Sequence, residues 1–428
     1  MKKQRARFFS ALVLFSLVGQ IAWVVENMYL NVFIYKMWNA SAADISHMVT
    51  ASAVAAALTT LFIGALSDRL GRRRLFISGG YILWGISIFA FAALRLELIE
   101  AMIPATVSAA SVGVALVIAL DCLMTFFGSS ANDAAFNAWL TEAVDSRRRG
   151  AAEGINAMMP LVAILAVFGG FMAFDLDAQK SWTYIFAIIG GVVLVVGVLG
   201  FFLIDEPKIS KKEGYLQTLV YSFRPSTLKK NTRLYLYLLA FVLFNISIQI
   251  FMPYLILYYE VSLKMANYVF VMAPAIVLAS VVTAFWGKVY DRGGFGRSCA
   301  WSMVWLCAGY VLLFFFRGTA MVFVGSLLMM CGYLSGMAVF GAKIRDLTPV
   351  GKSGMFQGVR IFSQVLVPGV VGPFIGKTVL ANAETIVNSD GTESFVPNAG
   401  IFLAALAVAA VLAILLGAIS RHRRAAKK

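Results

Sequence analysis

Charged side chains are scarce in this sequence. Of its 428 residues only 13% are charged, whereas 61% are hydrophobic and the mean hydropathy is +0.84. A soluble domain of ordinary composition carries about 25% charged residues. A water-soluble globular protein is therefore excluded, and much of the surface must face hydrocarbon.

Residues that bind metals or perform catalysis are also few. Of the two histidines, His422 falls outside the long apolar runs and His47 lies at the end of one. The four cysteines (Cys122, Cys299, Cys307 and Cys331) fall inside the runs at no metal-ligand spacing. No phosphate-binding P-loop, zinc-protease HExxH motif or serine nucleophile elbow occurs. We therefore expect no enzyme, no ATP-driven transport, no metal site and no cofactor.

What the sequence contains instead is a series of long apolar runs. About twenty helical residues cross the ~30 Å hydrocarbon core of a bilayer. The runs predict twelve membrane-spanning helices, at residues 8–36, 44–66, 75–94, 110–139, 150–174, 182–204, 233–259, 266–287, 298–316, 319–342, 354–380 and 397–419. The first run lacks a small-residue cleavage site, so we interpret it as a retained helix and not as a signal peptide.

The basic residues produce a net charge of +15, and their positions orient the chain. With both termini placed in the cytoplasm, 29 of the 36 Lys and Arg residues fall at inner ends of the predicted spans. This is the positive-inside distribution of membrane proteins. The basic charge therefore predicts topology, and we expect no nucleic-acid partner.

Two loops of the first half recur in the second half. At one constant offset along the chain, Gly64, Asp68, Arg69 and Gly71 correspond to Gly287, Asp291, Arg292 and Gly294. A second echo, at a slightly shorter offset, includes Glu142 and Asp346. Two echoes at corresponding loops indicate duplication of a six-helix unit. We expect a first bundle at 1–204, a cytoplasmic linker at 205–232 and a second bundle at 233–428.

The loop at 64–74 resembles, nearly position for position, the signature loop between helices 2 and 3 of the major facilitator superfamily (MFS). The loop at 287–297 resembles its degenerate copy between helices 8 and 9. The resemblance covers essentially the whole chain. It implies an all-α polytopic membrane protein, with twelve transmembrane helices in two pseudo-symmetric six-helix bundles. Helices 1, 4, 7 and 10 would line a cavity that opens alternately to either side.

The signature loop combines one acid, several bases and two glycines, so it can turn tightly and hold charges against neighbouring helix ends. Glu142, at the inner end of helix 4, is expected to complete a charge network with Arg69 and Arg72. We predict a conformational latch that stabilises the outward-facing state. Its residues are Gly64, Asp68, Arg69, Gly71, Arg72, Glu142, Asp291 and Arg292. The alternative is a topology signal whose charges are solvated.

Polar residues inside spans mark the expected substrate path, because polar groups stranded in lipid are costly. Helix 1 carries a polar face, with a weaker counterpart on helix 7. We predict that these faces bind the substrate through Gln20, Trp23, Asn27, Asn31, Asn245 and Gln249. An indole beside amides suits a sugar, which stacks on the ring and bonds the polar groups. The alternative is hydrogen bonding between helices.

Glu26 on helix 1 and Asp121 on helix 4 are acids inside predicted spans, at similar depths. Two carboxylates on facing helices can share a proton, so we predict that one or both couple transport to protons, with sodium as the other ion considered. Alternatively, each acid is bonded to an amide or a base. Arg360 is the only base well inside a span, and both a structural ion pair and a binding role remain open for it.

Helix 4 carries a weaker, second resemblance. Asp121, followed by Asn132, Asp133, Phe136 and Trp139, is distantly similar to the glycoside-pentoside-hexuronide cation symporters. Those relatives would pair such an acid with acids in helix 2, where this sequence offers only hydroxyls, so their sodium site is not expected. We hypothesise proton-coupled uptake of a sugar or glycoside by alternating access. The alternatives are proton-coupled export of drugs or metabolites and, from another class, a non-transporting sensor.

The expected partners are a small-molecule substrate and the lipid bilayer. A cavity within one chain favours a monomer. We expect an integral protein of the plasma or inner cell membrane, with both termini cytoplasmic.

Overall fold

A computed structural model of the chain describes residues 2–104, 106–144, 149–206, 221–349, 356–388 and 391–425. Nearly all secondary structure in these residues is helical. The chain divides into two compact units, Met1–Leu216 and Gln217–Lys428. The predicted bundle and linker bounds stay a prediction, since the division falls among residues outside the described ranges.

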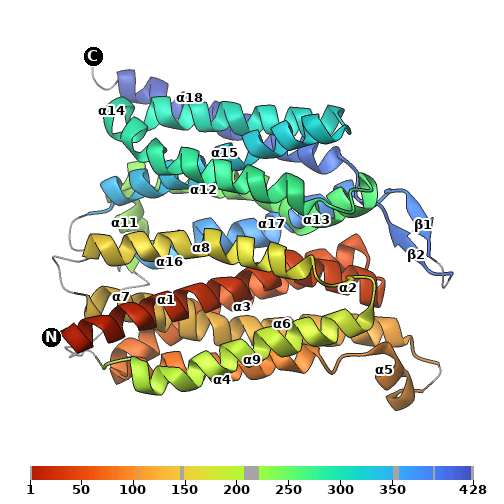
Figure 1. Cartoon of the computed structure of the whole chain (residues 1–428). Helices are drawn as coiled ribbons and strands as arrows, with labels where there is room; N and C mark the ends of the chain where they lie inside the picture. The colour runs from red at the N-terminus through yellow and green to blue at the C-terminus, as the bar shows by residue number, and fades with distance from the viewer. Residues whose placement is uncertain are drawn as a thin grey trace. The chain divides into compact units, whose positions relative to one another are not determined.

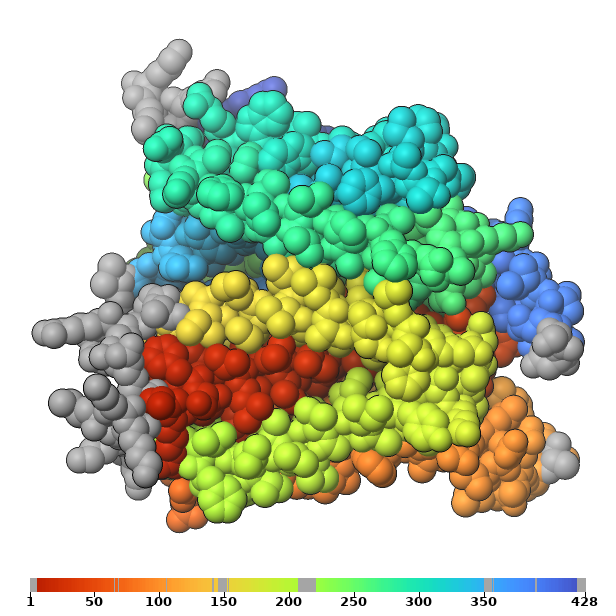
Figure 2. Space-filling view, in the orientation of Figure 1, coloured from red at the N-terminus to blue at the C-terminus, as the bar shows by residue number. Residues whose placement is uncertain are grey.

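The spans of unit 1 lie side by side (Figure 1). The first span is α1 (Lys2–Val24), continued by the π-helix η1 (Val25–Tyr29) and by α2 (Leu30–Trp38), and the next two are α3 (Ala42–Leu70) and α4 (Arg73–Phe91). Another span is α6 (Ala109–Gly128), continued by the π-helix η2 (Ser129–Phe136) and by α7 (Asn137–Ala143). The spans α8 (Arg149–Phe171) and α9 (Gln179–Leu203) follow. A short helix, α5 (Leu96–Met102), precedes α6 in the chain. Figure 2 shows α1 as a band between α8 and α9 on one face of this unit.

Local sequence fixes where the unit 1 helices begin and end. Ser41 and Asp44 form a capping box that starts α3, with the Ser41 amide donating to Asp44 Oδ2 at 2.9 Å and the Asp44 amide donating to Ser41 Oγ at 3.2 Å. Gly71 ends α3 with φ of +63°, a conformation that favours glycine. Gly85 of α4 would place a Cβ 2.6 Å from the Leu194 amide nitrogen, so a glycine there lets α4 and α9 pack closely.

Unit 2 begins, in its described part, before α11 (Pro225–Lys230). Its first span is α12 (Thr232–Phe251), continued by η4 (Met252–Tyr254), α13 (Leu255–Leu257) and the π-helix η5 (Tyr258–Ser262). The long helices α14 (Val269–Phe315) and α15 (Thr319–Leu347) follow. The next span is α16 (Gln357–Ile361), continued by the π-helix η7 (Phe362–Leu366) and by α17 (Val367–Val379), and after it comes α18 (Gly400–Ala425). An antiparallel hairpin, β1 (Thr385–Val387) with β2 (Glu393–Phe395), pairs Thr385 with Phe395. This hairpin lies in the loop at 381–397 and was not predicted.

Eleven helices of the described residues are long and apolar enough to cross a membrane. One of them, α14, has 47 residues and is about 70 Å long at 1.5 Å per residue, enough for two crossings. It bends at Gly294, where φ is +67°, between the predicted spans 266–287 and 298–316. The prediction of an all-α polytopic membrane fold is confirmed.

Candidate functional site

Three helices of unit 1 meet at the carboxylate of Glu26. This residue lies in η1, past the middle of the first span, and is 7% exposed. Its Oε1 accepts hydrogen bonds from Thr125 Oγ1 of α6 at 2.7 Å and from Ser52 Oγ of α3 at 3.1 Å. The two hydroxyl oxygens are 2.7 Å apart. Buried carboxylates need such donors, because an unsolvated charge in a protein interior is costly.

Asp121 lies one helical turn before Thr125 on α6 and is 2% exposed. It contacts Ser52, and it lies close enough to Glu26 for their charges to interact. One oxygen of each acid, Glu26 Oε2 and Asp121 Oδ1, has no hydrogen-bond partner among the described residues. The structure thus brings together the two predicted coupling acids, although it does not test their role.

Asp133 is a third acid of this region, and the sequence analysis did not assign it to the site. It lies in η2, where its Oδ2 accepts from Ser129 Oγ at 3.1 Å, and its charge interacts with Glu26. Asp121, Thr125, Ser129 and Asp133 follow one another at intervals of four residues. That spacing places them along one face of α6 and η2, and it is the sequence signal that would have found Asp133.

Aromatic rings line the same region. The Trp23 and Trp84 rings lie 5.1 Å apart between centroids, and Tyr81 lies 5.4 Å from Trp84. The Tyr81 hydroxyl accepts from Asn132 Nδ2 at 2.6 Å and donates to the Phe15 carbonyl at 2.7 Å. The indole Nε1 atoms of Trp23 and Trp84 are buried and have no partner among the described residues. Half-buried Trp23 lies three residues before Glu26 on the first span and offers a stacking surface near that acid, whereas Trp84 is fully buried and packs against Trp23.

The predicted amides of helix 1 are partly used by their own helix. Asn27 Nδ2 donates to the Trp23 carbonyl at 2.8 Å, and Asn31 Nδ2 donates to the Asn27 carbonyl at 3.0 Å. The Asn27 carbonyl belongs to η1, where the π-helical pattern changes backbone pairing, and Trp23 lies two residues before η1 begins. Asn27 is exposed, Gln20 is half-buried, and Asn31 Oδ1 is buried without a partner among the described residues.

The candidate residues of unit 2 do not form a comparable cluster. Asn245 is buried and its Nδ2 donates to the Phe241 carbonyl at 2.8 Å. Half-buried Gln249 packs against Gly372, where a Cβ would come within 2.4 Å of Gln249 Cβ. Arg360 of α16 is half-buried, and no carboxylate of the described residues lies within ion-pair distance of it.

The charge network of the signature loop uses a different arginine from the predicted ones. Arg69 and Arg72 are exposed, whereas Arg73 is 1% exposed and pairs with Glu142 through two hydrogen bonds of 2.7 and 3.0 Å. Its third contact is Ser67 Oγ at 2.5 Å. The turn at Gly71 starts α4 at Arg73, and this register directs Arg73, not Arg72, to helix 4.

The structure describes the surroundings of four other predicted latch residues, Gly64, Gly71, Asp291 and Arg292. Gly64 is buried in α3, and Gly71 makes the turn. Asp291 and Arg292 are exposed on α14. The side chain of Asp68 lies outside the described residues, so its predicted contacts stay a prediction.

Residues 8–373 match the family model of the Major Facilitator Superfamily, so the chain belongs to that superfamily. Its fold is similar to that of a mutant of the nucleoside transporter NupG, with a TM-score of 0.70 and 13% identity over 95% of this chain and 98% of that one. It is also similar to a bacterial homologue of the human lysosomal transporter Spinster, with a TM-score of 0.68 and 15% identity over 97% and 96% of the two chains. No curated protein matches significantly in sequence.

The chain is therefore an MFS secondary transporter, an integral membrane protein that moves a small molecule and needs no cofactor. It is not an enzyme. The predicted membership of the superfamily is confirmed, whereas the likeness to the glycoside-pentoside-hexuronide branch stays a prediction.

Proposed function

We propose that this protein is a proton-coupled transporter that takes up a small polar solute, a sugar or a glycoside, by alternating access. It would act as a monomer in the plasma or inner cell membrane, with both termini cytoplasmic. The observation that carries the proposal is the junction of Glu26, Ser52, Thr125 and Asp121 inside the membrane spans.

Proton coupling is supported by the chemistry of that junction. Neither Glu26 nor Asp121 forms an ion pair with a Lys or Arg among the described residues. The two neighbouring acids can therefore share one proton, which lowers their combined negative charge in an interior where charge is costly. The hydroxyls of Ser52 and Thr125 can donate to a charged carboxylate or rotate to accept from a protonated one. Asp133, farther along the same helix face, would be the next acid on the proton's route.

A sugar is supported by the aromatic wall beside the acids. Sugar rings present C–H faces that stack on indoles, and hydroxyls that pair with amides and carboxylates. Half-buried Trp23 supplies such a surface with a buried Nε1 donor, fully buried Trp84 packs against its ring, and Asn31 supplies a buried Oδ1 acceptor. Gln20, Asn27, Asn245 and Gln249 remain proposed substrate contacts on the same reasoning.

Among the described residues, the π-helical segments η1, η2, η5 and η7 support movement of these spans, because such segments interrupt regular helices and are frequent at functional sites. The ion pair of Arg73 with Glu142 would act as the latch of the inner ends, breaking and reforming during the cycle.

A second candidate, proton-coupled export of a cationic drug or metabolite, is favoured by one observation. Glu26 interacts with Asp121 and Asp133 and lies three residues after Trp23 on the first span, and a cation binds both to carboxylates and to aromatic faces. The two candidates differ in the direction in which protons move relative to the solute.

The test is proton movement in proteoliposomes that contain the full chain, followed with a trapped pH-sensitive dye. Sugars, glycosides, organic acids and cationic drugs are added singly. Glu26→Gln, Asp121→Asn and Asp133→Asn are compared with Glu97→Gln, the same change on an exposed carboxyl of α5 outside the cluster.

Proton entry with a sugar, lost in Glu26→Gln or Asp121→Asn but kept in Glu97→Gln, would support the proposal. Proton movement opposite to a cationic solute would establish the exporter instead. Uptake stimulated by sodium without proton movement would overturn the coupling assignment. No flux with any solute would favour a non-transporting sensor.

A further inference from the structure

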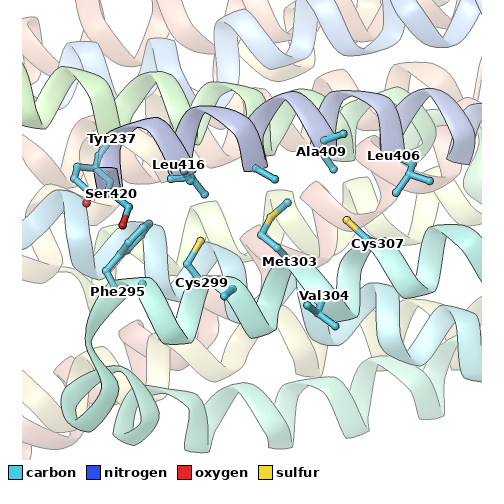
Figure 3. A pocket seen from close by; sticks show the side chains of 15 residues that line it. Tyr237, Phe295, Cys299, Met303, Val304, Cys307, Leu406, Ala409, Leu416 and Ser420 are labelled. Atoms are coloured by element: carbon cyan, nitrogen blue, oxygen red, sulfur yellow. The ribbon is translucent and has the colours of Figure 1, made fainter. Parts of the chain in front are cut away.

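A long apolar groove runs between two membrane-spanning segments of unit 2, the part of α14 after Gly294 and α18 (Figure 3). Its volume is about 520 Å³. Side chains from both helices point into it, with Cys299, Met303 and Cys307 on one wall and Leu406, Ala409 and Leu416 on the other. Apart from the thiols, the polar side chains that line it, among the described residues, are those of Tyr237 and Ser420.

The shape of the groove follows from residue size and spacing. Cys299, Met303 and Cys307 recur every four residues on α14, and small residues recur at the same interval on α18, at Ala409, Ala413 and Gly417. Residues at this spacing share one helix face. The small side chains leave a trench that extends about 16 Å along α18, from Leu406 to Gly417 at 1.5 Å per residue. This is the shape of an extended hydrocarbon chain.

The groove is open, and the segments that form it cross the membrane. Val304, on its wall, is 55% exposed, and Ala413 is also exposed. Hydrocarbon reaches such a surface from the bilayer, whereas a polar solute would find almost no partner in it. Methionine and cysteine are polarisable and fit flexible chains well.

One end of the groove is polar and positively charged. Tyr237 and Ser420 lie together there, beside Phe295 (Figure 3). Lys343 Nζ lies 5.3 Å from the centre of the Tyr237 ring. Arg421 is exposed and follows Ala413 and Gly417 at the same interval of four residues, so it extends their face past the groove. Exposed Arg297 follows the lining residue Gly296.

Two acids of this region, Asp291 and Asp346, are outnumbered by the bases Arg292, Arg297, Lys343 and Arg421. Asp346 accepts a hydrogen bond from the Tyr290 hydroxyl at 2.5 Å, and Asp291 is next to Arg292 in the chain. By the positive-inside rule this end faces the cytoplasm. The cytoplasmic leaflet is where anionic lipids attract basic residues of membrane proteins.

We propose that this groove is a binding site for an anionic phospholipid of the inner leaflet. One acyl chain would lie along Met303, Cys307 and Ala413, and the headgroup phosphate would meet Arg421, Arg297 and the hydroxyls of Tyr237 and Ser420. The site is independent of the transport cluster, because every lining residue belongs to unit 2.

The experiment uses the full chain in nanodiscs of phosphatidylcholine that contain a small fraction of phosphatidylglycerol with a diazirine in its acyl chain. After illumination, labelled peptides are mapped by mass spectrometry. Labelling concentrated at 299–307 and 406–417, and reduced by added unlabelled phosphatidylglycerol but not by phosphatidylcholine, is the expected result. Equal labelling of all exposed helix faces, or equal competition by both lipids, would overturn the proposal.

Two matched variants sharpen the test. Ala413→Phe fills the groove and should abolish the concentrated labelling, whereas Ala418→Phe makes the same change at an exposed residue outside the lining and should keep it. Arg421→Gln should weaken competition by phosphatidylglycerol about fivefold, the effect of one cation near an anionic headgroup. Unchanged labelling in Ala413→Phe, or disulfide-linked dimers through Cys307 in place of lipid labelling, would show that lipid is not the occupant.

Discussion

The two units share backbone features at corresponding positions. Asn27 of the first span corresponds to Asn245 of α12, and each donates its side-chain amide to the carbonyl four residues earlier, of Trp23 and Phe241 respectively. Gly71 and Gly294 also correspond, and at the turn after a span they have φ of +63° and +67°. The glycine pair, which falls at the offset of the first loop echo, shows that the duplication inferred from the loops extends to backbone conformation.

The cluster of buried acids, in contrast, lies in unit 1. At the offset that relates Asn27 to Asn245, Glu26 corresponds to Phe244, whose ring packs where a Cβ on Gly336 would lie. At the offsets of the two loop echoes, the other residues of the acid cluster, Ser52, Asp121, Thr125 and Asp133, correspond to Ala275, Gly325, Met329 and Met337. Corresponding positions thus hold hydrogen-bonded acids in unit 1 and apolar packing in unit 2.

The inner ends show the same asymmetry. In unit 1, Glu142 forms an ion pair with buried Arg73. In unit 2, the corresponding acid, Asp346, is exposed and accepts a hydrogen bond from the Tyr290 hydroxyl. Gly296 occupies the position that corresponds to Arg73. Substitutions at corresponding positions should therefore have unequal effects, larger in unit 1.

The largest effect on stability is expected from Arg73→Ala. Removing one partner of a buried ion pair costs about 3–5 kcal/mol, because the other charge is left without compensation. The Glu142 side chain is 30% exposed, so we expect the lower end of that range. Thermal unfolding in one detergent measures the change, with Arg74→Ala, an exposed neighbour, as the control. Equal shifts in the two variants would show that the ion pair contributes nothing.

A smaller effect, on transport, is expected from Thr125→Val. Valine keeps the shape of threonine but removes the hydroxyl that donates to Glu26 Oε1 at 2.7 Å. A hydrogen bond to a charged group contributes about 1.5–3 kcal/mol, so coupled proton flux should fall about tenfold or more. The matched change in unit 2, Met329→Leu, should leave flux unchanged. A similar loss in both variants would mean that packing, not the donor, limits transport.

Sequence predicted the spans well because hydrocarbon thickness sets the length of an apolar run, and this holds for every span alike. It did not reveal which arginine would face Glu142, because the answer depends on how the turn at Gly71 sets the register of α4. Nor did it assign Ser52 and Thr125 to the site. Hydroxyls in membrane helices commonly bond their own backbone, as Thr60 does here, so their presence alone indicates no partner.

The smallest effect on stability is expected in unit 2, where Asp346 is hydrogen-bonded by Tyr290 and not paired with an arginine. Tyr290→Phe removes one hydrogen bond to an exposed carboxylate and should cost about 1 kcal/mol or less. Tyr184→Phe, on an exposed ring of α9, is the control. Thermal unfolding of the two variants in the same detergent measures the difference.

The converse change, Gly296→Arg, repeats Arg73 in unit 2 at the offset that relates Gly71 to Gly294. A Cβ at Gly296 meets no atom within 4 Å, so the backbone tolerates a side chain. In the Tyr290→Phe background, the new arginine should pair with Asp346 and recover up to about 1 kcal/mol, the usual limit for an exposed pair. The apparent melting temperature measures the recovery, and Asp346→Asn should abolish it. Recovery that persists in Asp346→Asn would mean that the arginine acts elsewhere, and that the two inner ends match in sequence but not in space.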